Sequence, residues 1–417
     1  MQRTVLVVGM GYVGLPIAVR AAEIGHHVIG VDTSAGKIDA INNGLSYVED
    51  VSNERVMDAL RAGTLMAQTV DLGTKPVFDI ALITVPTPVD QFKKPDLTYI
   101  VSAAQYVAAC MTGGETVVLE STTYPGTTED VVARAIKEVN GMEPGRDYKL
   151  GYSPERINPG DKVHTFQTVP KIVSGVDGDS LIEIQSFYDT LVETTVPVSS
   201  PRAAELAKVV ENTFAQVNIA LVNEVALVCS ELGLDVDEVM DAAATKGHAF
   251  MRFRSGIGVG GHCISVDPLY LTWMRRERNG KAFKFAELAD EVNTYMPVHT
   301  MKRTREILKA RNVRLWQSRI LVLGAAYKPG VADIRESPAI KYINLLRDAG
   351  ADVTVADPHV NTPDDVELAW KTAGEHDLVV VATAHPEFDY ELIRQNAVAV
   401  LDTRSCYPFG ADKVHKL

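Results

Sequence analysis

The stretch Val5-Leu6-Val7-Val8-Gly9-Met10-Gly11-Tyr12-Val13-Gly14 decides the fold class of this chain. Four aliphatic residues in a row, ending at glycine, are typical of a strand that is buried on both faces. The three glycines have the spacing G-x-G-x-x-G, and an alanine-rich segment typical of a helix follows as far as Gly25. A second aliphatic run, residues 27–31, ends at Asp32. The first 32 residues therefore predict a β-α-β unit.

This glycine motif predicts a dinucleotide site. Gly9 permits the tight turn, Gly11 lets a pyrophosphate approach the backbone, and Gly14 lets the helix pack against the strand, while the helix N-terminus favours an anion. The carboxylate of Asp32 can accept hydrogen bonds from a ribose hydroxyl and would repel a 2′-phosphate, so NAD is expected rather than NADP. The alternative is a glycine-rich turn in a nucleotide-free fold. It is less favoured, because strand, helix and acidic residue all stand where the motif requires them.

Further aliphatic runs indicate the rest of the architecture. Runs at residues 80–85, 116–119 and 171–173, with helix-like segments between several of them, predict a mostly parallel, doubly wound sheet. From Ser200-Pro201 the chain stays helix-compatible to Gly233, about 30 residues, which is well beyond the usual helix length. Its apolar residues cover more than one narrow stripe. We interpret it as a spine between two domains and as a dimer contact.

A second strand-glycine-helix pattern begins near Arg319. It continues with a helix opened by Ser337-Pro338 and with aliphatic runs at residues 353–357, 378–381 and 398–402. The expected fold is α/β, with two Rossmann-like doubly wound domains joined by a long central helix and a helical middle domain. The expected domains are 1–199, 200–312 and 313–417. The turn at Gly324 lacks the second glycine of the motif, so it is not expected to hold a second NAD.

Composition limits the classes of partner. The 417 residues are 46% hydrophobic and 23% charged, as in ordinary globular proteins of two or three domains. The formal net charge of −13 argues against nucleic-acid and anionic-membrane binding, but it allows an anionic small ligand held by a few local Arg and Lys. No uninterrupted apolar run approaches the roughly 18 residues of a membrane span. The N-terminus leads directly into a strand, so a cytoplasmic location is expected.

The cysteines point to reactivity rather than to a framework. The chain has four, Cys110, Cys229, Cys263 and Cys406, without a C-x-x-C pair, so neither a disulfide framework nor a zinc site is expected, and no metal. Cys110 and Cys229 lie in helix-like apolar stretches and fit the small buried hydrophobe that a free cysteine usually is. Cys263 follows the glycine-rich residues 256–261, which suit a backbone passing close to a ligand.

Four neighbours or candidate partners of Cys263 each have a chemical and a structural interpretation. His262 is either a general base or a structural hydrogen-bonding group. Asp267, followed by Pro268, is either chemically active or the N-cap of a helix. Lys208 and Asn212 have the four-residue spacing that puts both on one face of the long helix, although a lysine there is usually a solvated surface residue.

These residues together resemble the UDP-glucose/GDP-mannose dehydrogenase family through almost the whole chain. The matching motifs, in order, are Gly9–Gly14 with Asp32, Val85–Pro88, Glu120–Thr122, Ser153–Arg156, Lys208 with Asn212, Gly260–Cys263 with Asp267, and Tyr327–Pro329 with Asp333 and Arg335–Pro338. The resemblance implies a four-electron oxidation of a nucleotide-sugar C6 alcohol to a carboxylate, with two NAD used in succession. It also implies that Cys263 forms a thiohemiacetal and then a thioester, which water hydrolyses.

The resemblance also implies roles for matched positions. Lys208 would stabilise the developing oxyanion, and Asn212 and Asp267 would orient or activate water. Glu155 would serve in acid/base work during hydrolysis, and Thr122 would support the same water network. The expected NAD contacts are Gly9, Gly11, Tyr12, Val13, Gly14, Asp32, Lys37, Pro86, Thr87, Thr122 and Arg335. The expected substrate contacts are Glu155, Arg156, Lys208, Asn212, Arg252, Arg254, Gly260 and Lys328. For Lys328 and Arg335 the alternative is a helix-end salt bridge.

Within the family, several segments are similar to the branch that acts on UDP-N-acetylhexosamines. They are His262, residues 266–273, Tyr47–Val51 and Glu291–Pro297, and they make UDP-N-acetylglucosamine the first choice. Residues 253–257 and Ser265 depart from that branch's pattern, so the galacto and manno epimers and UDP-glucose stay open. Two other classes share part of the pattern. A nucleotide-binding regulatory module would not need Lys208, Asn212 and Cys263 together, and a two-electron hydroxyacid dehydrogenase would lack Cys263.

Overall fold

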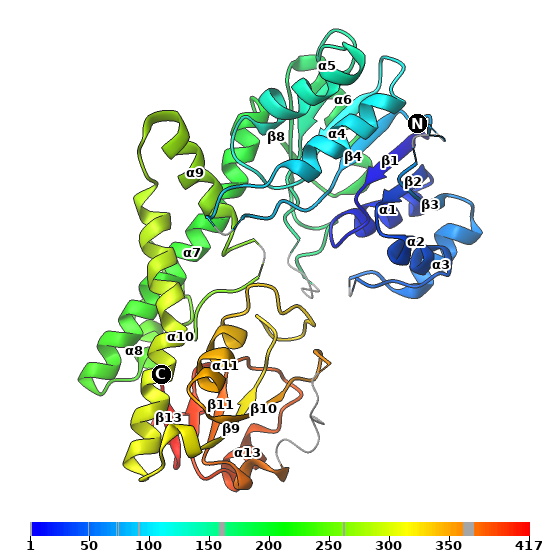
Figure 1. The fold of residues 1–417 in the computed structure, drawn as a ribbon. Helices are drawn as coiled ribbons and strands as arrows, with labels where there is room; N and C mark the ends of the chain where they lie inside the picture. The colour runs from blue at the N-terminus through cyan, green and yellow to red at the C-terminus, as the bar shows by residue number, and fades with distance from the viewer. Residues whose placement is uncertain are drawn as a thin grey trace. The chain divides into compact units, whose positions relative to one another are not determined.

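The computed structural model describes residues 2–48, 50–71, 73, 75–90, 92–157, 163–261, 263–361 and 371–417. The chain divides into two compact units, Met1–Glu211 and Asn212–Leu417, which are described separately (Figure 1).

The first unit contains an eight-stranded sheet with the order β3-β2-β1-β4-β5-β6-β7-β8. Neighbouring strands are parallel except for β6 and β7, which pair antiparallel. The strands are β1 Thr4–Val8, β2 His27–Asp32, β3 Leu65–Thr69, β4 Ile80–Ile83, β5 Thr116–Leu119, β6 Lys149–Tyr152, β7 Lys171–Gly175 and β8 Thr195–Pro197. The order 3-2-1-4-5-6 of the first six strands is that of the doubly wound dinucleotide-binding fold, and the predicted fold class is confirmed.

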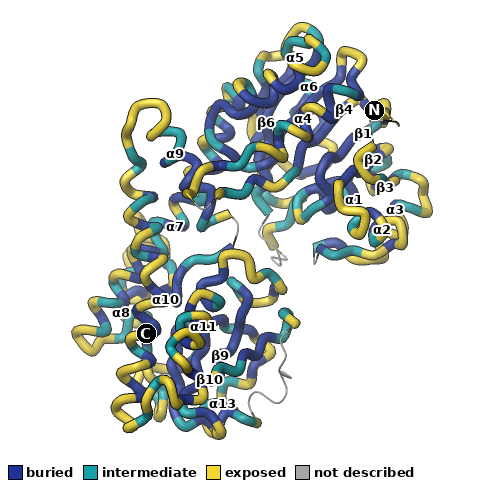
Figure 2. Tube along the Cα trace, in the orientation of Figure 1, coloured by how far each residue is buried: buried dark blue, intermediate teal, exposed yellow. Residues whose placement is uncertain are grey.

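The aliphatic run of β1 is continuous because both faces of the sheet are covered. Val5 and Val7 belong to one apolar cluster, which includes residues of the helices α1 and α6. Leu6 and Val8 belong to another, which includes residues of α4 and α5. The strands are accordingly buried along their length (Figure 2). The helices of this unit are α1 Gly14–Glu23, α2 Ala35–Asn42, α3 Asn53–Arg61, α4 Thr98–Cys110, the π-helical turn η1 Thr128–Val132, α5 Ala133–Asn140 and α6 Gly178–Leu191.

The second unit also has a sheet with an apolar cluster on each face, but with fewer strands. Its five parallel strands have the order β10-β9-β11-β12-β13 and are β9 Arg319–Leu323, β10 Asp352–Ala356, β11 Leu378–Val381, β12 Val400–Asp402 and β13 Val414–Lys416. Ile320 and Val322 pack into a cluster with α10 and α11, whereas Leu321 and Leu323 pack into another with α13. Helices and 3-10 turns of this unit are α8 Val236–Ala244, α9 Asp267–Asn279, α10 Lys284–Ala310, η2 Leu315–Gln317, α11 Pro338–Asp348, η3 Ala373–Glu375 and α13 Tyr390–Asn396.

The long helix α7, Pro201–Leu232, has 32 residues and confirms the predicted spine helix. The backbone N–H of Ala203 donates to the Ser200 hydroxyl at 3.3 Å, as a helix N-cap requires. By length and composition alone α7 could also cross a membrane. Length and composition are weak evidence for a membrane span, because the core helix of a globular protein meets the same criteria. Asn223 and Glu224 also interrupt the apolar run of α7.

Candidate functional site

The turn between β1 and α1 fits a dinucleotide pyrophosphate. Gly9 has a φ of +99°, which L side chains rarely adopt, and a Cβ on Gly14 would lie 2.0 Å from the carbonyl oxygen of Gly9. A Cβ on Gly11, by contrast, would meet nothing within 4 Å. The backbone at Gly11 is therefore open to a ligand, while the other two glycines are needed by the turn and by helix packing, as the motif predicts.

Asp32 ends β2 and is tied to the same turn. Its Oδ2 accepts from the backbone N–H of Met10 at 2.9 Å and from the Lys37 ammonium at 3.1 Å. Its Oδ1 accepts from the N–H of Ser34 at 2.9 Å. The predicted pair Asp32 and Lys37 thus lies together, with Asp32 buried and Lys37 half-exposed.

The other predicted NAD residues of this unit lie at the same edge of the sheet. Pro86 and Thr87 follow β4 and Thr122 follows β5, and both strands run parallel to β1, so the carboxyl ends of all three meet at one edge. Tyr12 is 40% exposed at the start of α1. The structure therefore brings most of the predicted NAD contacts to one edge, and Arg335, in the second unit, is the exception.

Glu155 follows β6 at that edge and is held by a buried cluster. Its Oε2 lies 2.9 Å from the Lys171 ammonium, and its Oε1 accepts from the backbone N–H groups of Arg156 and Ile157 at 2.6 and 2.8 Å. Lys171 also contacts Glu120 at 2.7 Å. No sequence motif assigns a role to Lys171, which is the first residue of an aliphatic strand run, although a charged residue in such a run is itself a signal.

Two basic side chains of the first unit differ in what they contact. The predicted substrate residue Arg156 is already paired, with Glu211 at 2.7 Å and with the carbonyl oxygen of Pro170 at 2.6 Å. Lys208 is only 7% exposed, and among the residues that the structure describes no carboxylate pairs with it. A buried ammonium without a counter-charge is costly, which favours a bound anionic or oxyanionic group as its partner. Asn212 lies one helical turn further along α7.

Cys263 lies in the turn immediately before α9, and its side chain is exposed. Its carbonyl oxygen accepts from the N–H groups of Val266 and Asp267 at 3.2 and 2.9 Å. Val266 occupies the N-cap position, so the N-cap alternative for Asp267 is wrong. Asp267 is instead the first residue of α9; it is buried, and its Oδ2 accepts from Asn212 Nδ2 at 2.5 Å. His262 lies outside the described residues.

Two of the other cysteines fit the use predicted for them. Cys110 and Cys229 are buried, as small hydrophobes are. Cys406, for which no use was predicted, is half-buried. Cys263 is the exposed one of the four.

The glycine loop before Cys263 is pressed against the predicted motifs of the C-terminal segment. A Cβ on Gly260 would lie 2.7 Å from atoms of both Tyr327 and Pro338, and one on Gly261 would lie 2.8 Å from the Tyr327 ring. The N–H of Gly261 donates to the carbonyl oxygen of Arg335 at 3.1 Å. Motifs about 65–80 residues apart in sequence are thus in contact, and side chains at these glycines would separate them.

A relay of buried amides anchors the start of this loop. The N–H of Gly256 donates to Asn223 Oδ1 at 2.9 Å, and Asn223 Nδ2 donates to Asn293 Oδ1 at 2.9 Å. Asn293 Nδ2 donates in turn to the carbonyl oxygen of Gln216 at 3.2 Å. The relay joins α7, α10 and the loop, and the sequence analysis found no role for Asn223.

The predicted basic contacts of the second unit have partners or are exposed. Arg252 pairs with Asp237 and Asp241 at 2.7 and 2.5 Å, and Arg254 is exposed. Arg335 pairs with Asp333 at 2.6 Å, which is the salt-bridge arrangement that the sequence analysis held as an alternative. The Lys328 ammonium lies 5.9 Å from the centre of the Tyr327 ring.

Arg404 is a functional candidate that the sequence analysis missed. Its Nε donates to the carbonyl oxygen of Ala382 at 2.7 Å, and its Nη1 would lie 2.3 Å from a Cβ on Gly256, beside the glycine loop. Burial lowers the pKa of Arg404 to about 10. Within the described residues no carboxylate forms a salt bridge with this guanidinium, so it can receive a phosphate. The available signal was its place two residues after the end of β12.

The turn after β9 differs from the turn after β1 in the groups that its backbone N–H groups bind. Asp357 Oδ2 accepts from the N–H groups of Ala325 and Ala326 at 2.7 and 2.9 Å and from His385 Nε2 at 3.0 Å. Burial alone would raise the pKa of Asp357, but these hydrogen bonds lower it well below its usual range. The N–H groups that would face a second pyrophosphate are therefore bound to a carboxylate of the protein.

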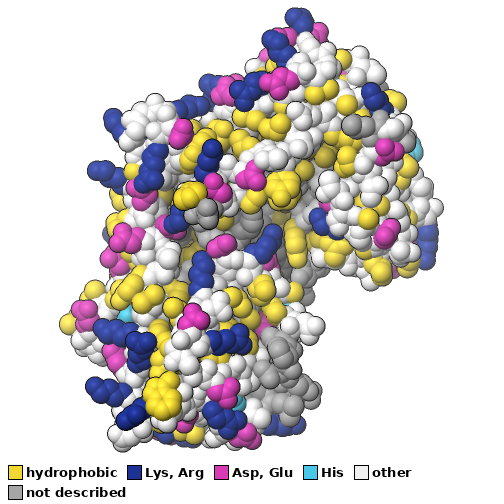
Figure 3. Space-filling view, in the orientation of Figure 1, with side chains coloured by type: hydrophobic (Ala, Val, Ile, Leu, Met, Phe, Trp, Pro, Cys, Tyr) yellow, Lys and Arg dark blue, Asp and Glu magenta, His cyan; other side chains and the backbone are white. Residues whose placement is uncertain are grey.

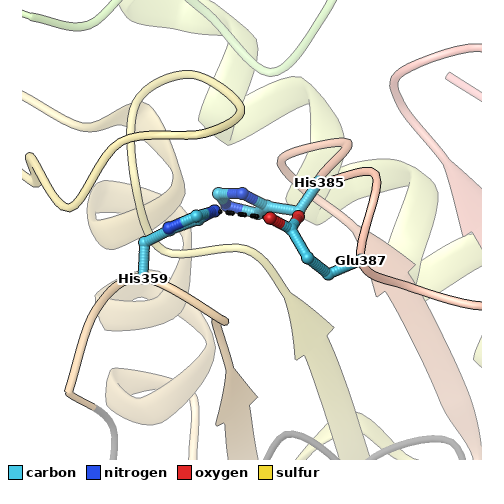
Figure 4. Close-up of side chains that lie close together, drawn as sticks. All are labelled: His359, His385 and Glu387. Carbon is cyan, nitrogen blue, oxygen red and sulfur yellow. Dashed lines mark hydrogen bonds and ion pairs between the residues drawn. The ribbon is translucent and has the colours of Figure 1, made fainter. Parts of the chain in front are cut away.

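His385 belongs to a cluster with His359 and Glu387 (Figure 4). His359 Nε2 lies 3.0 Å from Glu387 Oε1. The second ring nitrogen of His385, Nδ1, accepts from the N–H of Gly330 at 3.3 Å. Because both nitrogens of His385 are engaged, hydrogen bonding accounts for the approach of these side chains without a cation.

Charge is mixed on the face shown in Figure 3. Lys and Arg side chains are interspersed there with Asp and Glu side chains. This pattern accords with local basic residues at a ligand site rather than with a broad basic surface on that face.

Comparisons with known proteins agree over nearly the whole chain. In order, residues 3–192 match the NAD binding domain of the UDP-glucose/GDP-mannose dehydrogenase family, residues 202–295 its central domain and residues 321–408 its UDP binding domain. A UDP-N-acetyl-D-glucosamine 6-dehydrogenase from Pseudomonas aeruginosa is 34% identical, over 92% of this chain and 91% of the relative. A UDP-N-acetyl-D-mannosamine dehydrogenase from Pyrococcus horikoshii is 35% identical, over 92% and 90%.

A solved structure agrees in fold. The UDP-D-ManNAc dehydrogenase of Pyrococcus horikoshii superimposes with a TM-score of 0.90 at 31% identity, covering 99% of this chain and 98% of that one.

Proposed function

Because this chain belongs to the UDP-glucose/GDP-mannose dehydrogenase family and is an NAD-dependent UDP-sugar 6-dehydrogenase, we propose that its substrate is a UDP-N-acetylhexosamine. UDP-N-acetylglucosamine is the first choice, and UDP-N-acetylmannosamine and UDP-glucose are the alternatives. Relatives named for both N-acetyl sugars match at nearly the same identity, so they support the N-acetylhexosamine class more than either epimer.

The observation that carries the proposed chemistry is the exposed Cys263 close to the Asn212–Asp267 pair, in which Asp267 is buried and Asn212 half-buried. We propose that the C6 alcohol is oxidised to the aldehyde and that the Cys263 thiolate then adds to the aldehyde carbon as a thiohemiacetal. A second oxidation gives the thioester. Water then attacks, the C–S bond breaks, and the acid and the free thiol result. Bound NAD would accept the two electrons removed in each oxidation.

The chain's own residues have distinct parts in this scheme. Lys208, whose buried ammonium has no carboxylate partner within the described ranges, would stabilise the oxyanions that form at C6. Asn212, fixed by its bond to Asp267, would orient the water, and Glu155 would accept its proton, with Thr122 supporting the same water.

Binding of the UDP part would fall to basic residues of the second unit. Lys328 and Arg404 would face the diphosphate, and Gly260 would let the sugar approach the backbone. Arg252, Arg254 and Arg335 would contribute only with some rearrangement or longer reach, since the first and last are paired with carboxylates.

The organisation of the whole protein completes the proposal. We propose three domains, 1–199, 200–312 and 313–417, a homodimer, and a cytoplasmic location.

The experiment that tests the reaction is the number of NADH formed per sugar. Limiting UDP-N-acetylglucosamine, UDP-N-acetylmannosamine, UDP-N-acetylgalactosamine and UDP-glucose would each be incubated with excess NAD. We expect two NADH per sugar, with the fastest substrate identifying the pocket. One NADH per sugar would contradict the thioester route.

Substitution of the nucleophile separates binding from chemistry. We expect Cys263→Ala to bind NAD as the wild type does and to form no acid, because no thioester can form. Cys229→Ala, at a buried cysteine of α7, is the matched control and should keep two NADH per sugar. Acid formation by Cys263→Ala at the wild-type rate would remove the covalent step.

A further inference from the structure

Lys171 has an environment that neither the motifs nor the proposed chemistry explains. It is the first residue of β7 and is 2% exposed. Its ammonium lies between two carboxylates, 2.7 Å from Glu120 Oε2 and 2.9 Å from Glu155 Oε2. The same ammonium lies 5.4 Å from the ring centres of Phe166 and Tyr188. Such a group is fixed from every side that the structure describes.

Stability alone is a weak reason for this arrangement. Burying charges costs several kcal/mol per ion, and replacing a buried ion pair by apolar side chains is often neutral or stabilising. The cluster also carries one positive and two negative formal charges. An apolar residue at position 171 alone would leave Glu120 and Glu155 close together without a counter-charge, so the lysine has to be explained by what it does to the two carboxylates.

The two carboxylates differ in surroundings. Glu120 is fully buried, and the Tyr188 hydroxyl donates to its Oε1. Glu155 is 9% exposed, at the sheet edge where the predicted NAD residues gather, and two backbone N–H groups donate to its Oε1. Hydrogen bonds from N–H groups stabilise the ionised carboxylate. Glu155 is therefore the outer member of the cluster, and Glu120 is the inner one.

We propose that Lys171 is a positioning residue for Glu155. Lys171 holds Glu155 in place and in the ionised form that accepts a proton from water, whereas the Glu120 carboxylate disfavours that form. This inference rests on the acid/base role proposed above for Glu155. A base must be ionised before it can act, and an adjacent ammonium favours the ionised form, whereas an adjacent carboxylate disfavours it.

The ionisation of the cluster is consistent with this geometry. Burial and the neighbouring Glu155 raise the pKa of Glu120, against the effect of Lys171. Burial would lower the pKa of Lys171, but Glu120 and Glu155 raise it. Other charged or titratable groups facing Glu155 are Tyr188 on α6, whose pKa is raised by burial and by Glu120, and the Arg156–Glu211 pair, which reaches α7.

The test is the pH dependence of acid release in two variants with opposite expected shifts. Enzyme in excess over UDP-N-acetylglucosamine, with saturating NAD, would be quenched at intervals. The rate of acid formation after NADH formation would be measured from pH 5 to pH 9. In Lys171→Met, Glu155 loses the neighbouring ammonium of Lys171 but keeps the neighbouring carboxylate of Glu120. The acid limb of the profile should move up by about one pH unit or more. In Glu120→Gln the acid limb should move to lower pH, because Glu155 loses a neighbouring negative charge.

Three further variants complete the design. Lys171→Arg keeps the positive charge and should keep the acid limb at the wild-type pH. Lys137→Met removes an exposed lysine that is paired with Glu143, and it should not move the acid limb. If Lys171→Met does not fold, Glu120→Gln still tests the direction. A purely structural role would lower the rate in both variants without opposite shifts. Limbs that stay at the wild-type pH in Lys171→Met and Glu120→Gln would overturn the inference.

Glu155→Gln distinguishes this failure from a failure of the proposed function. If Glu155→Gln retains the acid limb and the rate of acid release, the role of Glu155 itself is wrong. If Glu155→Gln abolishes the limb and the two neighbouring variants leave it in place, Glu155 is the base and only the role of Lys171 is wrong.

Discussion

At the scale of single residues, Asp32 has a counter-charge that the sequence motif does not include. Lys37 lies 3.1 Å from Asp32 Oδ2, beside the carboxylate that the motif assigns to the ribose hydroxyl. We therefore expect the carboxylate to do two things: it would accept hydrogen bonds from the ribose hydroxyls, and it would neutralise the lysine that otherwise attracts a phosphate.

We expect Asp32→Ala to raise the KM for NAD about tenfold or more and to improve the use of NADP, because Lys37 is released. Adding Lys37→Ala should remove the gain with NADP while NAD stays weak. Steady-state kinetics with both cofactors measures this. An unchanged KM for NAD in Asp32→Ala would contradict the assignment of Asp32 to the ribose.

Glu205 makes stability depend on pH. It is fully buried in α7, and its Oε1 accepts from the N–H and hydroxyl of Thr128 at 2.8 and 2.7 Å, at the start of η1. Burial raises the pKa of Glu205 from 4.5 to about 7. Between these values the folded state holds a proton that the unfolded state has released, so its contribution to stability is lost as the pH rises from about 4.5 to about 7.

Glu205→Gln should remove this dependence. The difference in unfolding free energy between wild type and variant should fall by roughly 3 kcal/mol between pH 4.5 and pH 7. Urea unfolding at several pH values measures it. A difference that stays constant with pH would show that Glu205 does not titrate in this range.

At the scale of elements, the amide relay sets the course of the loop that carries Cys263. Asn223 on α7 and Asn293 on α10 are 0% and 6% exposed; Asn223 Oδ1 accepts from the N–H of Gly256, and Asn293 Oδ1 accepts from the Asn223 amide. We expect Asn223→Leu to lower stability by about 1–3 kcal/mol, because the N–H of Gly256 and the amide of Asn293 lose their partner. It should also slow acid formation more than it weakens NAD binding.

Asn218→Leu is the control for this prediction. Asn218 lies on the same helix, and its amide donates only to the carbonyl oxygen of Phe214 within that helix. Its effect on stability should be small. Equal losses in Asn218→Leu and Asn223→Leu would contradict the anchoring role.

The elements that the sequence predicted are those with an unambiguous pattern. Strands β1, β2, β4 and β5 are aliphatic runs because helices cover both faces of the sheet, and periodicity finds them. Strand β3, with a glutamine and a threonine at an edge, and β13, with only three residues, carry too little pattern. Strand β6 contains Gly151, whose Cβ would lie 2.0 Å from the carbonyl oxygen of Ser174, a requirement that only the fold reveals.

At the scale of the whole molecule, the parts of the site that could be predicted are those fixed by local chemistry. The glycine turn with Asp32, and Cys263 after its glycines, follow from spacing. Lys171 and Arg404 could not be found in this way, because their importance comes from neighbours that lie far off in sequence. For the same reason spacing did not show that Arg156 and Arg252 are paired with carboxylates.

The second unit leaves apolar side chains exposed along two long helices, and this is the structural basis for the proposed homodimer. On α7, residues 214, 221 and 228 are seven apart and therefore share one face of the helix, and on α10 the exposed side chains recur at three- and seven-residue spacing. These exposed residues are Phe214, Leu221, Val228, Leu232, Phe285, Leu288, Tyr295 and Val298. Exposed apolar surface of this extent commonly marks an interface between proteins, and a second copy of the chain offers the same stripes in return.

We therefore expect sedimentation velocity to show a dimer of the wild type at micromolar concentration. Leu221, which is 55% exposed, is the central position on α7. Leu221→Glu should shift the protein to monomer, because two like charges would face each other or their partner's apolar side chains across the interface. Val77→Glu, at an 80% exposed residue of the first unit, should remain dimeric. A wild type that sediments only as monomer would remove the dimer, while a dimer that persists in Leu221→Glu would place its interface away from α7.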